Sequence, residues 1–231
     1  MTAPDQPHPL DRPIWNSLNG RQADFGMGGP LARRYKPEVS LFAAVGDDGE
    51  EAQAALLALI PMGGEVGRLD PEMPPPIAGT RIKFQAVLNQ MLLRDLSPAR
   101  RPPVDWVDLD ESDAPAMLAL ATLTRPGPFL TQTHRLGRFV GIRRDGRLVA
   151  MAGERMKPAP GFTEVSAVCT HPDWRGHGFG EGLMRVVIER ILARGEATFL
   201  HCYPDNPAVA LYRALGFEVR REMVYSMVEH A

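Results

Sequence analysis

The sequence predicts an α/β protein with two domains. Its 231 residues are 44% hydrophobic, which is enough apolar material for one large or two small cores. Short apolar runs bounded by glycine and proline alternate with segments of helical periodicity, as in α/β folds. Beyond residue 160, a predicted strand, a glycine-rich loop and a helix follow one another directly. These observations place the chemistry in the second half of the chain.

The first half carries no chemical motif. We expect a short strand at 40–45 and a helix at 50–59, whereas the apolar run 82–93 fits a strand or a helix equally well. A cluster of prolines marks the domain boundary: Pro98, Pro102 and Pro103. We therefore divide the chain into an N-terminal α/β region at 1–100 and a second domain at 101–231.

Apolar periodicity and turn residues define the elements of the second domain. We expect strands at 104–109, 139–143, 147–156, 162–170, 198–202 and 219–228, helices at 112–123 and 180–194, and a last helix between Asn206-Pro207 and Gly216. Ser112 is the predicted cap of the first helix. Asp145-Gly146 suits the positive φ angles of a two-residue hairpin turn.

Charge and composition exclude several classes of function. The 26 basic and 28 acidic residues nearly cancel, so the sequence predicts neither a nucleic-acid partner nor a membrane partner. No stretch reaches the roughly 18 apolar residues of a membrane span. The two cysteines, Cys169 and Cys202, lack the paired spacing of a zinc site, and we expect no metal. A reducing, cytoplasmic location is the natural expectation.

The segment "RGHGFG" is typical of an anion-binding loop. Gly176, Gly178 and Gly180 remove side chains at alternate positions, which lets backbone N–H groups face one anion at the start of a helix. A Walker loop needs Gly-Lys followed by Ser or Thr, and none occurs. A dinucleotide fingerprint fails because Glu181 and Leu183 stand where it needs Gly or Ala. The loop predicts pyrophosphate binding, and the alternative is a plain glycine turn.

With this loop in place, residues 139–228 resemble the GNAT superfamily of N-acyltransferases. Arg175, Gly178 and Gly180 match the signature of that family, "EVSAVCTHPDW" matches the strand before it, and "DNPAVALYRALGF" matches its last helix. The resemblance implies a mixed, mostly antiparallel sheet with splayed central strands, flanked by helices. It implies acetyl-CoA as a cosubstrate and transfer to an amine. It also implies that residues 1–100 are a degenerate companion domain that shapes the acceptor cleft.

The resemblance also implies a set of cofactor-binding residues. Backbone groups of Val168 and Thr170 would pair with the pantetheine arm, and Asn206 would contact CoA, although Asn before Pro is also a standard helix cap. The pyrophosphate would lie on the loop itself: Arg175, Gly176, His177, Gly178, Phe179 and Gly180. We expect His171 and His177 to have surface or loop roles.

Two residues are the candidates for catalysis. Tyr212 stands where related enzymes place a general acid, and a phenol with a pKa of about 10 can return a proton to a thiolate with a pKa of about 8.5. Glu164 stands where some relatives carry a base for the amine, with His201 and Tyr203 as rivals. Core packing for Tyr212 and salt bridging for Glu164 are the alternatives. Cys169 is expected to be a buried thiol rather than an acyl carrier.

The leading interpretation is an enzyme that moves an acetyl group from acetyl-CoA to an amine by direct transfer in a ternary complex. The acceptor is a small molecule or a peptide, and we expect the loop 126–133 to border its site. A CoA-binding sensor without turnover is the alternative from another class, and a scaffold ranks third. Whether the chain forms a homodimer stays open.

Overall fold

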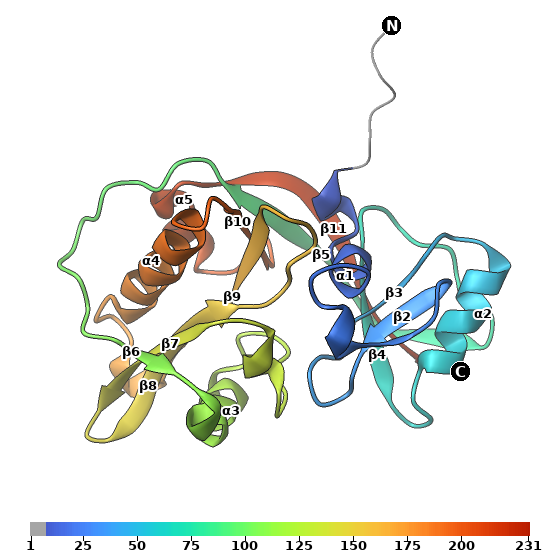
Figure 1. Ribbon diagram of the computed structural model, residues 1–231, viewed down its shortest axis with the longest axis horizontal. Helices are drawn as coiled ribbons and strands as arrows, with labels where there is room; N and C mark the ends of the chain where they lie inside the picture. Colours follow the sequence, from blue (N-terminus) through green and yellow to red (C-terminus); the bar gives the residue numbers. More distant parts are fainter. Residues whose placement is uncertain (1–7) are drawn as a thin grey trace, which may run out of the picture.

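A computed structural model describes residues 8–231 (Figure 1). Its helices are α1 (Pro13–Leu18), α2 (Glu50–Leu59), α3 (Ala114–Thr124), α4 (Phe179–Leu192) and α5 (Val209–Leu215). The strands before residue 100 are β1 (Gly26–Gly28), β2 (Ala32–Tyr35), β3 (Ala43–Val45), β4 (Glu65–Asp70) and β5 (Thr80–Leu93). Those after it are β6 (Val107–Leu109), β7 (Phe139–Arg144), β8 (Arg147–Glu154), β9 (Phe162–Thr170), β10 (Ala197–Cys202) and β11 (Phe217–His230).

The main sheet has eight strands in the order β4-β11-β5-β10-β9-β8-β7-β6. Neighbouring strands run antiparallel except β9 and β10, which are parallel. Helices α3 and α4 cover opposite faces, because the apolar residues of β7 and β8 alternate between two core clusters, one under each helix. The predicted fold class, a mostly antiparallel mixed sheet flanked by helices, is confirmed.

A smaller α/β region precedes this sheet in the chain. It consists of α1, α2 and the three-stranded sheet β1-β2-β3. A parallel bridge between Phe42 and Gly67 joins this sheet to β4, and Gly67 is needed there because a Cβ atom would collide with Leu41. The apolar run 82–93, left open by periodicity, is part of strand β5.

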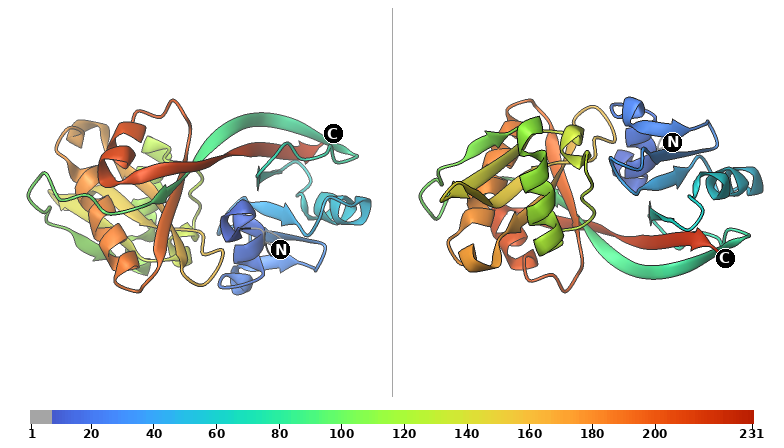
Figure 2. Two further views of the ribbon diagram at one scale, coloured as in Figure 1. Left: turned by 90° about the horizontal axis from the view of Figure 1, so that it is seen from above. Right: turned by 90° about the horizontal axis from the view of Figure 1, so that it is seen from below.

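Strands β5 and β11 link the two parts of the molecule. They pair from Leu93 and Phe217 at one end to Thr80 and His230 at the other, and their outer halves curve over the N-terminal region (Figure 2). The division of the chain at residue 100 stays a prediction, and the eight-stranded sheet contains strands from both sides of it.

Local signals predicted most elements of the second domain. Strand 162–170 has its predicted bounds, and Asp145 and Gly146 have φ angles of 51° and 75° in the hairpin turn. The predicted cap at Ser112 is wrong. Asp110 instead caps a short 3-10 turn at Glu111–Asp113, because its carboxylate accepts the Ser112 N–H at 2.8 Å, and α3 begins only at Ala114. None of the helices in residues 8–231 is long and apolar enough to span a membrane.

Candidate active site between strands β9 and β10

Strands β9 and β10 pair only where they begin. Their parallel register runs from Phe162 and Ala197 to Glu164 and Phe199, after which β10 stays with β5 and β9 stays with β8. In β9 two residues, Ala167 and Val168, face the single Ala152 of β8, and Ala167 has a φ of 53°. This bulge turns the end of β9 away from β10. The predicted splay is thus present, with a strained residue at its centre.

The end of β9 lies beside the glycine-rich loop. The His171 N–H donates to the Val149 carbonyl of β8 at 2.7 Å, so the backbone of the preceding Thr170 faces the other way, towards the gap. A Cβ atom at Gly180 would lie 3.9 Å from both the Thr170 hydroxyl and a Val168 methyl group. The structure therefore brings Val168, Thr170 and Gly180 together at one end of the gap.

The loop itself needs its glycines. Gly176 and Gly178 have φ angles of 81° and 76°, in the left-handed region that side chains disfavour. Helix α4 begins at Phe179, so the loop leads directly into the positive end of a 14-residue helix. Nothing lies within 4 Å of a Cβ atom at Gly176. The loop is thus open towards solvent and able to receive an anion.

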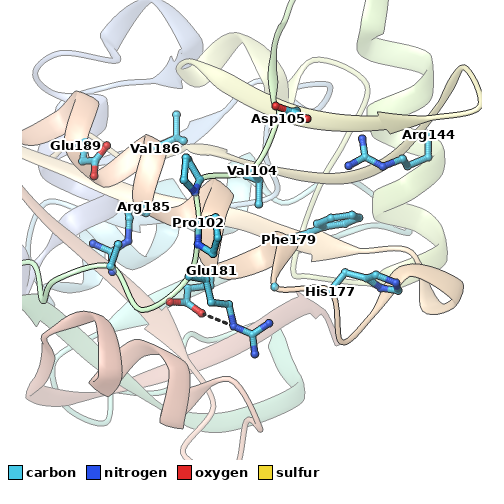
Figure 3. Close-up of a pocket in the computed structure, with 15 residues that line it drawn as sticks. Pro102, Val104, Asp105, Arg144, His177, Phe179, Glu181, Arg185, Val186 and Glu189 are labelled. Atoms are coloured by element: carbon cyan, nitrogen blue, oxygen red, sulfur yellow. Dashed lines mark ion pairs between the residues drawn. The ribbon is translucent and has the colours of Figure 1, made fainter.

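Two cavities flank the loop. One, of about 290 Å³, lies between the loop, Thr170 and Leu211 of α5. The other, of about 570 Å³, lies between α4 and the linker that precedes β6 (Figure 3). Val104 of this linker packs on α4 at Gly182, where a Cβ atom would lie 2.6 Å from a Val104 methyl group. The linker is therefore part of the wall of the site.

Arg101 of the linker is a site residue that sequence reasoning missed. It lines both cavities, and its Nη1 lies 3.1 Å from the position of a Cβ atom at Gly178. Its Nε lies 3.8 Å from Glu181 Oε2, the ion pair drawn in Figure 3. The pair "RR" within a proline-rich linker was its only signal, and nothing local indicated that the linker returns to the loop.

A third cavity, of about 250 Å³, lies beyond the end of β10, where His201, Cys202 and Tyr203 border it. Its other wall comes from the N-terminal region and the β5–β11 ribbon, which contribute Phe42, Leu69, Leu88 and Tyr225. The loop after α3 adds Arg125, Pro126, Gly127 and Pro128. The predicted loop 126–133 thus borders a cavity with its first residues, while Phe129 is buried in the core.

Comparisons with known proteins decide the family. The chain is 43% identical to a protein of Novosphingobium aromaticivorans assigned to the GNAT family of acetyltransferases, over 97% of this chain and 99% of that one, with a TM-score of 0.89. This chain belongs to the GNAT family. A family model described as FR47-like protein matches residues 139–226.

More distant structures share the GNAT fold. A GCN5-related N-acetyltransferase from Kribbella flavida is 22% identical, with 88% of each chain covered and a TM-score of 0.60. A GCN5-related N-acetyltransferase-like protein from Streptococcus suis is 17% identical over 96% of this chain and 94% of that one, with a TM-score of 0.58. No curated protein gives a significant match.

Tyr212, the predicted acid, lies on α5 and packs against Phe217 with ring centroids 6.4 Å apart. Burial, followed by the neighbouring Cys202 thiol, raises the pKa of Tyr212 to about 12. Among residues 8–231, no group forms a hydrogen bond with its hydroxyl. Leu211, rather than Tyr212, borders the cavity beside the loop. The acid role of Tyr212 stays a prediction.

The remaining predicted cofactor residues lie in three kinds of position: a helix-capping turn, the exposed loop and the core. Asn206 Oδ1 accepts the Ala208 N–H at 2.8 Å, so Asn206 caps the turn that leads into α5, and it also borders the third cavity. Arg175 and His177 are exposed, and His177 Nδ1 lies 3.0 Å from the Arg175 carbonyl. Phe179 is only 8% exposed and packs in the core beneath Arg144, which leaves its backbone to face the loop.

Glu164 lies at the base of the gap in a saturated pocket. Its carboxylate accepts two hydrogen bonds from Arg155, both at 2.8 Å, one from His201 Nδ1 at 2.8 Å and one from the Met156 N–H at 3.2 Å. Burial alone would raise the pKa of Glu164, but the Arg155 guanidinium and the donors outweigh it and hold the pKa far below its ordinary value. The carboxylate is ionised and its four acceptor positions are filled.

The hydrogen bonds around Gln90 define the tautomer of His201. Gln90 Oε1 accepts from Arg220 at 2.7 Å, so its amide nitrogen donates, once to the Leu10 carbonyl and once to His201 Nε2 at 3.1 Å. His201 then carries its proton on Nδ1, towards Glu164. Both ring nitrogens of His201 are therefore occupied within the protein.

The two cysteines of this GNAT domain are buried thiols. Burial raises the pKa of Cys169 to about 11 and the pKa of Cys202 to about 11. A thiol with a raised pKa is a poor nucleophile near neutral pH. Cys169 thus has the buried position that the sequence predicts. Residues 8–231 contain no cluster of three or more His, Cys, Asp or Glu side chains with the geometry of a metal site.

Proposed function

We propose that this GNAT protein transfers an acetyl group from acetyl-CoA to an amine, directly and within a ternary complex. The observation that carries the proposal is the splay of β9 from β10, with the glycine loop at one side of the gap and the third cavity at the other. A thioester in this gap would have its phosphates on the loop and its acyl carbon towards the cavity. Both substrates would then meet without a covalent acyl-enzyme.

The loop fits the phosphates of CoA. Left-handed glycines and the start of α4 offer backbone N–H groups, which bind pyrophosphate without a net positive protein. Arg101 adds a cation beside the loop, and Arg144 and Arg185 line the larger cavity next to it. These side chains suit the phosphorylated nucleotide end of CoA. The free backbone at Thr170 and the bulge at Val168 suit the amide groups of the pantetheine arm.

The reaction requires one bond to form and one to break. The amine nitrogen attacks the thioester carbonyl, the carbon–sulfur bond of the oxyanion intermediate breaks, and the nitrogen loses a proton. Tyr212 protonates the leaving thiolate and recovers a proton from the nitrogen, directly or through water. A pKa near 12 keeps Tyr212 protonated at neutral pH, so the acid is present before the thiolate forms.

Glu164, unlike Tyr212, has every hydrogen-bonding position occupied by other groups of the protein. The sequence predicts a base at this position, and that role stays a proposal. The filled hydrogen-bond shell of Glu164 favours a second role, in which the carboxylate fixes Arg155 and His201 at the wall of the third cavity. The buried free thiols agree with the proposed reducing, cytoplasmic setting.

The test is release of free thiol from acetyl-CoA with a panel of small amines, amino acids and peptides. We expect turnover with at least one class, and a fall in kcat of about 100-fold or more for Tyr212→Phe with an unchanged Kd for acetyl-CoA. Tyr35→Phe is the matched control, because the Tyr35 hydroxyl donates to Gln22 at 2.7 Å and Tyr35 borders none of the three cavities. Tight binding of acetyl-CoA without turnover of any amine would favour the sensor and contradict the enzyme.

A further inference from the structure

The third cavity has walls of two kinds, apolar and cationic. Phe42, Leu69, Leu88 and Tyr225 supply apolar surface, and its volume of about 250 Å³ is near the lower end for ligand pockets. The cationic part consists of Arg125 and Arg155. No Asp or Glu is among the residues that border it. Such a cavity fits a small ligand with an apolar body and an anionic group.

From these contacts, and resting on the proposed function, we propose that the acceptor is an α-amino acid with an apolar or aromatic side chain, whose carboxylate is bound by Arg155 and Arg125. The amine would then point towards the gap between β9 and β10, and the side chain would lie against Phe42 and Leu88.

Arg155 is held in place before any ligand arrives. Its Nε and Nη2 donate to the two oxygens of Glu164 at 2.8 Å each, and its guanidinium lies over the Phe42 ring at 5.2 Å from the centroid. The side chain is 11% exposed. A guanidinium fixed on two sides loses little conformational entropy when it binds a further anion.

The third nitrogen of Arg155 is the one that faces the cavity. Within residues 8–231 no acceptor bonds to its Nη1, which lies 3.9 Å from the position of a Cβ atom at Gly127 in the cavity wall. Since Glu164 neutralises much of the charge of Arg155, Arg125 supplies the remaining positive charge. In the described chain Arg125 forms no ion pair, and it ends α3 in the left-handed region at φ 50°.

The same charges help the amine to react. An amino acid arrives as an ammonium ion, and a nearby guanidinium disfavours that charged form, which lowers the pKa of the amine. One proton leaves to solvent, and the neutral nitrogen then forms the amide bond while the carbon–sulfur bond breaks and the sulfur takes up the second proton. The cavity thus promotes loss of the first proton without a carboxylate base in its wall.

The test compares acceptors that differ only in the carboxylate. At saturating acetyl-CoA we expect kcat/KM for phenylalanine to exceed that for phenethylamine and for phenylalanine amide by about 10- to 100-fold, the effect of losing a charge-assisted hydrogen bond. Leucine and isopentylamine form a second matched pair. Because these comparisons use the wild-type protein, no variant has to fold.

Variants assign the effect to residues. Arg125→Gln should raise KM for phenylalanine about 10-fold and leave KM for phenethylamine unchanged, whereas a purely structural role would change both. Arg155→Lys keeps a charge next to Glu164 but loses the fixed Nη1, and we expect it to lower the preference for phenylalanine over phenethylamine.

Three outcomes would overturn the proposal. Equal kcat/KM for phenylalanine and phenethylamine would rule out the proposed contact with the carboxylate, while the proposed acetyltransferase function would still stand. Better turnover of peptides with an N-terminal phenylalanine than of the free amino acid would identify a peptide acceptor instead. Turnover of no amine in the whole panel, with acetyl-CoA still bound, would contradict the proposed function itself and this acceptor with it.

Discussion

The two sides of the gap between β9 and β10, the proposed donor side and the proposed acceptor side, are built in different ways. The glycine loop presents backbone at the start of one helix, and its neighbours Val168 and Thr170 come from the strand just before it. The third cavity is built from residues of seven separate segments, from Phe42 to Tyr225. A backbone site accepts any CoA thioester, whereas a side-chain cavity can change with few substitutions. We therefore expect the way the donor binds to be shared across the fold, and the choice of acceptor to be specific to this chain.

The two sides should also differ in what holds them together. The proposed acceptor side rests on the buried pair of Arg155 and Glu164, whereas in the pair at the loop the Arg101 side chain is 61% exposed and that of Glu181 is 22% exposed. We expect Glu164→Ala to lower the free energy of unfolding by about 3–5 kcal/mol, because it leaves a buried guanidinium unpaired. Glu181→Ala should cost less than about 1 kcal/mol. In thermal unfolding, we expect Glu164→Ala to lower the Tm by roughly 6–20 °C.

The acid stability of the protein sharpens the same comparison. The folded-state pKa of Glu164 lies below its unfolded value of 4.5, so its contribution is complete above pH 4.5 and is lost as the pH falls below it. The difference in unfolding free energy between wild type and Glu164→Gln should therefore shrink as the pH is lowered from 4.5 in urea titrations. A difference that does not change with pH would show that the carboxylate has no depressed pKa.

Arg101 tests whether side chains matter on the donor side. We expect Arg101→Ala to weaken acetyl-CoA binding about 5- to 10-fold at low salt, with the effect shrinking as salt screens the charge. Arg100→Ala is the matched control, because it removes a neighbouring exposed charge that does not border either cavity of the loop. An equal loss of acetyl-CoA affinity in both variants would indicate a general electrostatic attraction by the linker instead of a specific contact of Arg101.

The smallest expected effect is on the alkaline side of the rate profile. A Tyr212 pKa of about 12 means that the acid stays protonated up to about pH 10. With both substrates saturating, kcat should not fall between pH 7 and pH 10 while the protein stays folded. A fall with an apparent pKa near 8.5 that is absent in Tyr212→Phe would assign a lower pKa to this residue.

The elements of the proposed donor side could be predicted from the sequence because their signals are local. The hairpin turn, strand β9, the glycine loop and helix α4 each depend on residues that are neighbours in the chain, such as Asp145-Gly146 and Gly176. The acceptor side depends on the curved ribbon of β5 and β11, which brings Leu88 and Tyr225 next to Phe42. Apolar periodicity could not assign β5, because half of it is buried on both faces and half is exposed.

The positions of the Arg155 and Arg101 side chains could not be predicted from local sequence either. Neither belongs to a motif, and each acquires its place only through contacts distant in sequence, with Glu164 in one case and Gly178 in the other. Glu164 was predicted as a site residue, but its burial by four donors could not be foreseen from the strand that carries it.

We expect backbone groups of the glycine loop to bind the donor and side chains beyond β10 to select the acceptor. Calorimetric titration of acetyl-CoA tests it with Gly176→Ala, Gly195→Ala and Arg155→Lys. Gly176 and Gly195 have φ angles of 81° and 73° with nothing near a Cβ atom, so both replacements carry similar strain, but only Gly176 lies in the loop. We predict that Gly176→Ala weakens binding at least about 10-fold and that the other two bind like wild type. Full affinity in Gly176→Ala together with a loss in Arg155→Lys would contradict the account.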